Sequence, residues 1–482
     1  MPFSSFERQE RDIPPVVFSK AAPFVTSFIE ELNKSIEAGK PGQGLSKIQK
    51  GWLSFCIMGV IVTNSVCWAR FERAGLGGYS MAALCWVFRH AKIPWDLLLQ
   101  SSVGVILNGF GITDGSLLLD DTDKRRSKST RRIGHVHKIK DKATGGFVMG
   151  QEIVFLVLAT AKITFPVGFA FYMPDPALSK WYRQKKQLAK GGMGPLARKP
   201  APNKNYPNKQ EIALRLLREF KKNHPKIRVR CVVADALYGS KHFVGAASKI
   251  FDGVQVISQL KSDQNVRFKN KTMTVETFFS TYAAVTEKIP LRGGEPVGAI
   301  VASARLHVCA HGVKRFVIAI KYEGEEQYRY IVASDLSWRT QDILGAQSLR
   351  WLVEVFHEDW KQYEGWEKLT KQQGEEGSSN SLILSLLTDH CLLLHPEQTT
   401  RIENNLPACT VGSLQARVRV DSLLDLIQEL LASENPNERL SQLSEKVKEL
   451  RQLQPSKKHM IGRDLGRLDP SPSLKYKAEK AA

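Results

Sequence analysis

Residues 116–121 read SLLLDD, and a second stretch of the same kind, IRVRCVVAD, covers residues 227–235. Each is a largely apolar run of strand length that ends in an acidic residue, Asp121 in the first and Asp235 in the second. We therefore predict two buried strands with carboxylates at their ends. A compact fold can bring such strand ends together, so the two aspartates are candidates for one site.

The elements around these two strands predict a mixed α/β domain. Residues 153–161 and 165–172 are apolar, β-branched or aromatic, which is typical of an antiparallel hairpin. Apolar spacing predicts a helix over 210–223, and another is expected over 242–250, before a strand over 254–260. The expected order is strand, strand, strand, helix, strand, helix, strand.

The flanking regions change character several times. Helical periods, broken at Gly75 to Gly78 and at Pro94, predict a helical module in which residues 81–107 have the form of a helix-turn-helix, although any two packed helices give the same signal. Short strand patterns fill 261–336, and helical patterns return over 340–363. These changes predict an arm (1–43), a helical domain (44–110) that is a candidate for DNA binding, an α/β domain in two parts (111–260 and 339–400) that holds the candidate site, a β-rich insertion (261–338) and a helical carboxyl-terminal region with a basic tail (401–482).

The charge of the chain favours a polyanionic partner. The formal net charge is +21 at pH 7 and the pI is about 9.6, which gives a positive potential that attracts nucleic acid. A ribosome-associated or membrane-surface protein would show the same charge. The apolar stretch 52–68 contains several polar residues, so we interpret it as a core helix and expect no membrane span. Seven scattered cysteines without C-x-x-C spacing predict buried free thiols in a reducing cytoplasm.

A third acid stands on the helix predicted after the insertion. Arg350, Glu354 and Lys361 are spaced by four and seven residues, which places them on one helical face. Three carboxylates that converge would hold two hard cations, Mg²⁺ or Mn²⁺, for phosphoryl transfer. An ordinary amphipathic ion-pair helix gives similar spacing, and Glu358 shares the face as a rival ligand.

The two aspartates of the first strand are rivals as well. Asp120 and Asp121 point to opposite faces of a strand, so only one can face the site, and we choose Asp121. Taken singly, Asp121 is equally compatible with a turn residue and Asp235 with a helix cap. The joint pattern favours metal binding.

Basic residues follow the first strand. Their mixture with serine and threonine suits contacts to DNA phosphates, although a solvated loop would have the same composition: Lys124, Arg125, Arg126, Lys128, Arg131 and Arg132. A later loop, residues 185–209, extends the track with Lys185, Lys186, Lys190, Arg198 and Lys199. We interpret His135 and His137 as loop histidines near phosphate, because no partners stand at metal-ligand spacing.

Asp121, Asp235 and the sequence Arg350-x3-Glu354-x6-Lys361, placed after a β-rich insertion, resemble the DDE transposases of insertion-sequence family four. The resemblance covers about residues 116–363 and includes Asp121 directly before Thr122, as in some relatives. The family signature is Y-x2-R-x3-E-x6-K, and Gln347 stands here at the tyrosine position. Three of its four members therefore match.

The resemblance implies a ribonuclease-H-like catalytic core with two divalent ions and cut-and-paste transposition of a bacterial insertion sequence. It implies that Arg350 and Lys361 hold the terminal phosphate, and that a homodimer joins terminal inverted repeats to target DNA. Some relatives use a DNA hairpin and a stacking tryptophan; Trp338 lies near that region, and the step stays open. The alternatives are a transposase-derived DNA-binding protein that no longer cuts, and a metal-dependent repair nuclease.

Overall fold

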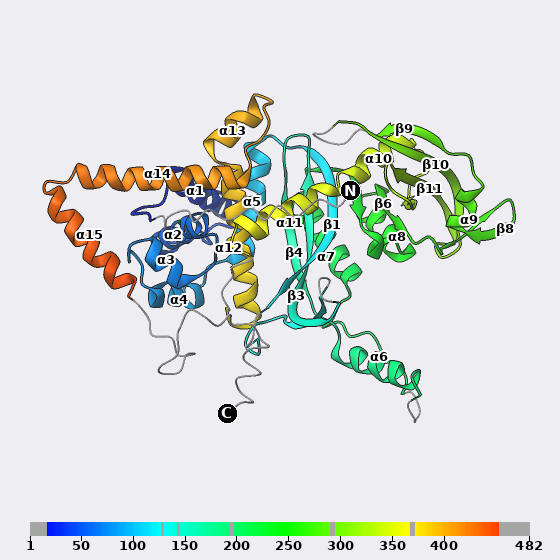
Figure 1. Cartoon of the computed structure of the whole chain (residues 1–482), viewed down its shortest axis with the longest axis horizontal. Coiled ribbons are helices and arrows are strands. Elements are labelled where there is room, and N and C mark those ends of the chain that lie inside the picture. The colour runs from blue at the N-terminus through cyan, green and yellow to red at the C-terminus, as the bar shows by residue number, and fades with distance from the viewer. Residues whose placement is uncertain are drawn as a thin grey trace. The chain divides into compact units, whose positions relative to one another are not determined.

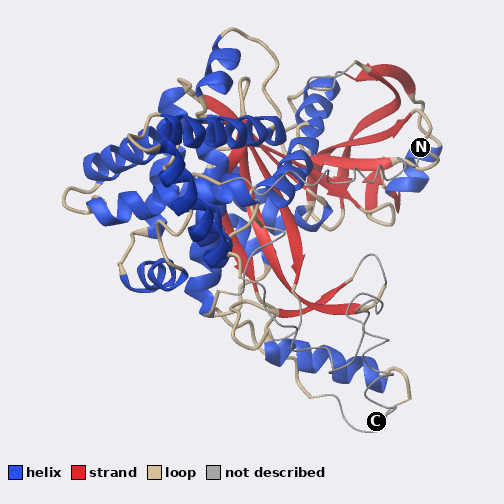
Figure 2. Cartoon of the chain, turned by 60° about the vertical axis from the view of Figure 1, so that its left-hand side comes forward, coloured by secondary structure: helices blue, strands red, loops and turns tan. Residues whose placement is uncertain are grey.

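The computed structural model describes residues 17–126, 130–141, 145–191, 197–289, 295–366 and 372–452 (Figure 1). The chain divides into two compact units, residues 1–429 and 430–482. The first unit contains a large mixed sheet with helices packed on it (Figure 2). In the second unit, the helix α15 (Pro436–Leu450) has no buried residue.

The centre of the sheet is built around β1 (Asp114–Arg125). It pairs antiparallel with β3 (Phe147–Ala159) on one side and parallel with β5 (Arg228–Ala234) on the other. Beyond these, β4 (Thr164–Tyr172) pairs with β3, and β6 (Gln255–Leu260) lies parallel to β5. The predicted order of three strands, helix, strand, helix, strand is present, but two elements that were not predicted interrupt it: β2 (His137–Lys140), which pairs with β3, and a helix over Pro176–Leu188. His137, expected in a loop, is therefore the first residue of a strand.

The alternation of side chains in β1 directs its residues to two different cores. Leu117 and Leu119 pack on one face with α7 (Lys209–Asn223) and α8 (Lys241–Ile250). Leu118 packs on the opposite face, which α11 (Trp351–Tyr363) and α12 (Gly374–Leu393) cover. The sheet is therefore buried on both faces, as its nearly continuous apolar strands require.

The insertion continues the central sheet. Its last strand, β12 (Arg329–Ala333), pairs antiparallel with β6, and β11 (Val313–Tyr322) and β10 (Val297–Val308) follow outward. The remaining elements are β7 (Asn265–Phe268), β8 (Lys271–Thr274), α9 (Val275–Ser280) and β9 (Val285–Ile289). The predicted β-rich character of this region is confirmed.

The amino-terminal helices form a module with its own apolar core. They are α1 (Pro23–Gly39), α2 (Lys47–Thr63), α3 (Trp68–Ala74), α4 (Met81–His90) and α5 (Trp95–Gly109). A capping box starts α2, in which the Ser46 side chain accepts from Gln49 N–H and the Gln49 side chain accepts from Ser46 N–H. The module shares its core with α12 and with α14 (Val411–Leu431), while α13 (Pro396–Glu403) lies between those two helices in sequence.

The apolar helix α2 is a core helix, as the sequence predicted, with a continuous buried run from Trp52 to Val62. Within the described residues, no single helix meets the length and hydropathy of a membrane span. The pair α2 and α3 meets them only when the two helices are joined, and these bend by 88° at their junction.

Two local predictions were wrong in extent. The first strand does not end at Asp121 but runs on to Arg125, because Thr122 and Lys124 are buried on one side of it. A helix, α6 (Pro176–Leu188), occupies the start of the expected loop, so Lys185 and Lys186 lie in its last turn. The helical patterns predicted over 340–363 are confirmed as two helices, α10 (Thr340–Ser348) and α11, which are separated by Leu349 and Arg350.

The cysteines are all free, as predicted, but not all buried. Cys56, Cys231 and Cys391 are buried, and Cys309 is exposed. Of the other expectations, Lys128 and the basic tail from residue 455 lie outside the described residues.

Candidate metal centre

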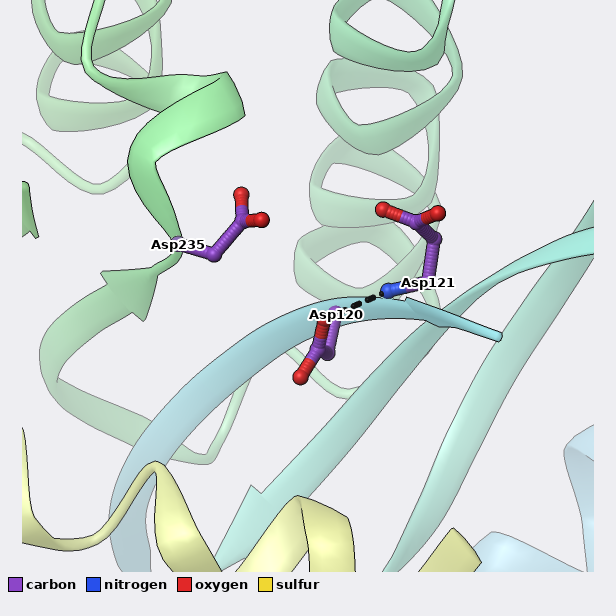
Figure 3. A group of neighbouring side chains, drawn as sticks. All are labelled: Asp120, Asp121 and Asp235. Carbon is purple, nitrogen blue, oxygen red and sulfur yellow. Dashed lines mark hydrogen bonds between the residues drawn. The ribbon is translucent and has the colours of Figure 1, made fainter. Parts of the chain in front are cut away.

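Three aspartates meet where β1 and β5 run side by side. One carboxylate oxygen from each of Asp120, Asp121 and Asp235 lies within 4.8 Å of the others (Figure 3). The parallel pairing of β1 and β5, with Leu119 opposite Ala234, places these residues next to one another. The predicted convergence of two strands far apart in the sequence is thus present in the fold.

Asp235 has two roles at once. It directly follows β5, and its side chain accepts a hydrogen bond of 2.9 Å from Leu237 N–H, which caps the short 3₁₀ helix η1 (Ala236–Tyr238). Burial, followed by the charge of Asp121, raises the pKa of Asp235. The cap orients one oxygen and leaves the carboxylate within the acidic cluster.

Asp120 and Asp121 project on opposite sides of β1, as strand geometry requires (Figure 3). Asp120 is 7% exposed and accepts a hydrogen bond of 3.1 Å from Arg350 Nη1. Burial raises its pKa to about 6; the charge of Glu354 adds to this, while that of Arg350 opposes it. The choice between the two aspartates therefore stays a prediction, since both have an oxygen in the cluster.

Asp121 belongs to a chain of charged groups on the face covered by α7. Lys209 Nζ lies 2.6 Å from Asp121 Oδ2 and 2.9 Å from Glu152 Oε1, and Glu152 Oε2 lies 2.8 Å from His137 Nε2. Burial alone would raise the pKa of Glu152, but hydrogen bonds from His137 and Lys209 outweigh it and hold the pKa at about 2. Asp121 and Glu152 also hold the pKa of Lys209 above its usual value, against the effect of burial.

Glu152 and Lys209 were missed from the sequence. Glu152 stands opposite Asp123 in the ladder between β1 and β3, on the same side as Asp121. Lys209 is the first residue of α7, which a capping box of Asn208 and Glu211 starts. The capping signal was visible in the sequence, but the register of β3 was not.

Arg350 links Glu354 to the acidic cluster by ion pairs. Arg350 Nη1 lies 3.1 Å from Asp120 Oδ2 and 3.2 Å from Glu354 Oε1, so one guanidinium joins the strand to the first turn of α11. The Glu354 side chain is 44% exposed, and Glu358 is exposed one turn further on. Phe356 and Trp360 anchor α11 on the sheet. The third predicted acid thus stands beside the cluster and outside its 4.8 Å grouping.

The basic residues after Asp121 have different surroundings. Lys124 is 6% exposed and donates to the carbonyl oxygen of Trp366, whereas Arg126 lies 5.3 Å over the ring of Trp366 and also donates to the Gln151 side chain. Arg125 forms an ion pair with the buried Asp141. The exposed members of the predicted DNA-binding set, among the described residues, are Arg125, Arg131, Arg132, Lys185 and Lys186, while Lys361 is partly buried.

Two further predicted positions are packed into the protein. Gln347, which stands at the tyrosine position of the signature, has a buried Oε1 without a hydrogen-bond partner among the described residues. Trp338 is partly buried against the core under α10 and α11. In the proposed helix-turn-helix, α5 is largely enclosed by α1 and α12, and α4 exposes 61% of Trp86.

The strand order β4-β3-β1-β5-β6, with only β3 running opposite to the rest and with α7 and α8 as crossovers, defines a ribonuclease-H-like fold. No protein-family model and no curated protein matches the chain. Among solved structures, the chain is similar to a piggyBac transposase synaptic complex with hairpin DNA, at 10% identity and a TM-score of 0.42, over 91% of this chain and 85% of that chain. The NurA nuclease from Sulfolobus solfataricus is similar at 9% identity and a TM-score of 0.23, over 48% of this chain and 72% of that chain. At these values, function has to be argued from the site.

Proposed function

We propose that this chain is a divalent-metal-dependent DNA enzyme of the DDE transposase class. The observation that carries the proposal is the convergence of Asp120, Asp121 and Asp235 within 4.8 Å, beside the helix that bears Glu354. Buried and crowded carboxylates in a strongly basic protein cost free energy unless cations compensate them. A site of this kind suits catalysis on a polyanion.

The donor set fits hard cations. All of the candidate ligands are carboxylates, which favour Mg²⁺ or Mn²⁺ over softer metals. Oxygen ligands of Mg²⁺ lie about 2.1 Å from the ion, so two ligands of one ion are at most about 4.2 Å apart, close to the observed grouping. We propose Asp121, Asp235 and Glu354 as the ligands, with Asp120 and Glu358 as rivals and two ions per site.

The metal ions and two basic residues of the site, Arg350 and Lys361, have distinct proposed roles. Bound Mg²⁺ would activate the attacking oxygen and stabilise the leaving oxygen. Arg350 can grip phosphate oxygens through its planar guanidinium, and Lys361 stands about three turns further along α11. We propose that the chain cleaves the ends of a bacterial insertion sequence and joins the 3′ ends to target DNA as a homodimer, acting in the cytoplasm.

The test uses purified full-length protein, labelled terminal-repeat DNA and a target plasmid in Mg²⁺. We expect Asp235→Asn and Glu354→Gln to lower end cleavage and strand transfer by about 10³-fold, because the metal contribution of several kcal/mol is lost at ~1.4 kcal/mol per tenfold. Binding to the DNA ends should change little. Normal joining by either variant would reject the metal centre.

A matched control and a paired comparison sharpen the test. Asp263→Asn removes one exposed carboxylate from the insertion and should leave joining intact. Asp120→Asn and Asp121→Asn are compared by calorimetric titration with Mn²⁺. The variant that lacks the metal ligand should bind Mn²⁺ more weakly. The same titration decides between Glu354→Gln and Glu358→Gln.

Two other functions make different predictions. A metal-dependent repair nuclease would cut unrelated duplexes as well as terminal repeats and would not join them to a target. A DNA-binding derivative that no longer cuts would bind terminal repeats without cleavage in either metal. The retention of the acidic cluster favours an enzyme over that derivative.

A further inference from the structure

A basic segment of the chain connects β4 of the central sheet to α7. It covers residues 176–208 and is called here the basic arm; α6 forms its first part, and its described residues are 176–191 and 197–208. In Figure 1, α6 projects beyond the ends of β3 and β4. The arm contains no aspartate or glutamate, and its cationic residues are Lys180, Arg183, Lys185, Lys186, Lys190, Arg198, Lys199 and Lys204.

Apolar burial does not explain this helix. None of the residues of α6 is buried, so the hydrophobic effect that holds the other core helices contributes little here. Eight cations without an acid in the arm also repel one another. A surface of this composition is stabilised by a bound polyanion, whose charge it complements.

The arm nevertheless has a defined local structure. Trp181 Nε1 donates a hydrogen bond of 2.6 Å to the Ala197 carbonyl, which ties α6 to the returning segment. Lys185 Nζ lies 5.4 Å from the Trp181 ring centroid, and Lys199 Nζ lies 5.8 Å from that of Tyr182. These contacts fix the aromatic rings and hold the lysines on a formed scaffold.

The residues that flank the arm, Tyr172 before it and Lys209 after it, meet beside the acidic cluster. Lys209 directly follows the arm, and its Nζ contacts Asp121 Oδ2 at 2.6 Å. The same ammonium lies 5.3 Å from the ring centroid of Tyr172, the last residue of β4 before the arm. The base of the arm therefore lies beside the carboxylates.

We propose that the basic arm binds the phosphate backbone of duplex DNA next to the scissile phosphate, without reading its bases. This inference rests on the proposed function in taking DNA as the substrate. The 13 residues of α6 span about 20 Å at 1.5 Å per residue, the length of about six phosphates of one strand at 3.4 Å each. Four cations on α6 are therefore enough for several phosphate contacts.

The experiment measures DNA binding by fluorescence anisotropy, without metal, in full-length protein carrying Asp235→Asn. The arm variant replaces Lys180, Arg183, Lys185 and Lys186 with glutamine, which keeps the helix propensity. The slope of log affinity against log salt should become less steep by up to about 3.6, at about 0.9 for each phosphate that the variant no longer neutralises. The decrease in affinity should be equal for terminal-repeat and scrambled duplexes.

Matched variants separate local contact from net charge. The control replaces four exposed lysines outside the arm by glutamine, Lys222, Lys226, Lys249 and Lys261, and should keep most of the affinity and slope. A variant with arginine at Lys180, Lys185 and Lys186 should bind as the parent does. Equal decreases in affinity in the arm variant and the control overturn the proposal, as does stronger competition by poly-glutamate than by DNA.

Cleavage and joining are measured separately, so the two proposals can fail independently. If the protein with its acids intact joins DNA ends while the arm variant binds normally, the arm proposal is rejected and the proposed function stands. If the arm variant loses duplex binding while no metal supports cleavage, the arm proposal stands and the enzyme assignment is rejected.

Discussion

Two carboxyl groups are buried where α11 ends against α12. Glu364, directly after α11, is 0% exposed, and Asp389 on α12 is 9% exposed. Burial raises the pKa of Asp389 to about 7, and burial with the Asp389 charge holds the pKa of Glu364 well above its usual range. Both groups therefore stay protonated in the folded protein at pH values where an unfolded chain is ionised.

The change Asp389→Asn removes one of these titrations. Raising the pKa from 3.8 to about 7 corresponds to about 4 kcal/mol, at ~1.4 kcal/mol for each tenfold change in the acid constant. Below about pH 3, well under the unfolded pKa of 3.8, the folded and unfolded states both hold the proton, so the cost is absent. As the pH rises toward 7, the unfolded state loses its proton first. The free energy of unfolding of the wild-type protein should therefore fall by about 4 kcal/mol, and that of the variant should not show this decrease.

The free energy of unfolding is measured by urea denaturation at several pH values from about 3 to about 8. Hydrogen exchange of the α12 amides gives a local readout, because Trp360 Nε1 donates to Ser385 Oγ at 2.9 Å on that helix. Asp263→Asn, an exposed change, should follow the wild-type curve. Parallel pH curves for the wild-type protein and Asp389→Asn would refute the reasoning.

Three further changes test the packing around the site. Lys209→Gln should lower the melting temperature in the presence of chelator, because Asp121 and Glu152 lose the cation that they share. Adding Mn²⁺ should raise the melting temperature of the variant more than that of the wild type, and equal increases in calorimetry would contradict this. Leu386→Ala, at a side chain with 0% exposure under the sheet, should cost about 2–5 kcal/mol of unfolding free energy in urea, and less than 1 kcal/mol would be a failure. Gly134→Ala would place a methyl group 2.5 Å from backbone in the first turn of α12, so faster proteolysis after residue 126 is expected, and unchanged digestion would refute it.

The core order was predictable because its signal is local. The runs that lead to Asp121 and Asp235 are apolar over several residues, and 117–119 of β1 and 232–234 of β5 are 0% exposed. The periodic helix α7 begins one residue before its predicted start. For these elements, local pattern and tertiary burial agree.

The rest depended on contacts that the local pattern does not contain. The continuation of β1 to Arg125 requires a buried lysine, Lys124, whose acceptor on Trp366 is 242 residues away. In α6 the apolar residues Leu178, Trp181 and Tyr182 recur at helical spacing, but none of them is buried, so this spacing is not matched by packing against the core. Glu152 joined the site only through the register of β3 against β1.

The hydrogen bonds between β12 and β6 join the insertion to the same sheet that carries Asp121 and Asp235. Residues Tyr330–Ala333 pair with Ile257–Leu260, so the insertion cannot swing as a hinged lid without opening the ladder. A natural or engineered deletion of residues 265–333 would keep all the acids of the candidate metal centre and yet leave β6 as an unpaired edge strand. Such an edge recruits strands from other molecules, so loss of the insertion would be felt first as aggregation.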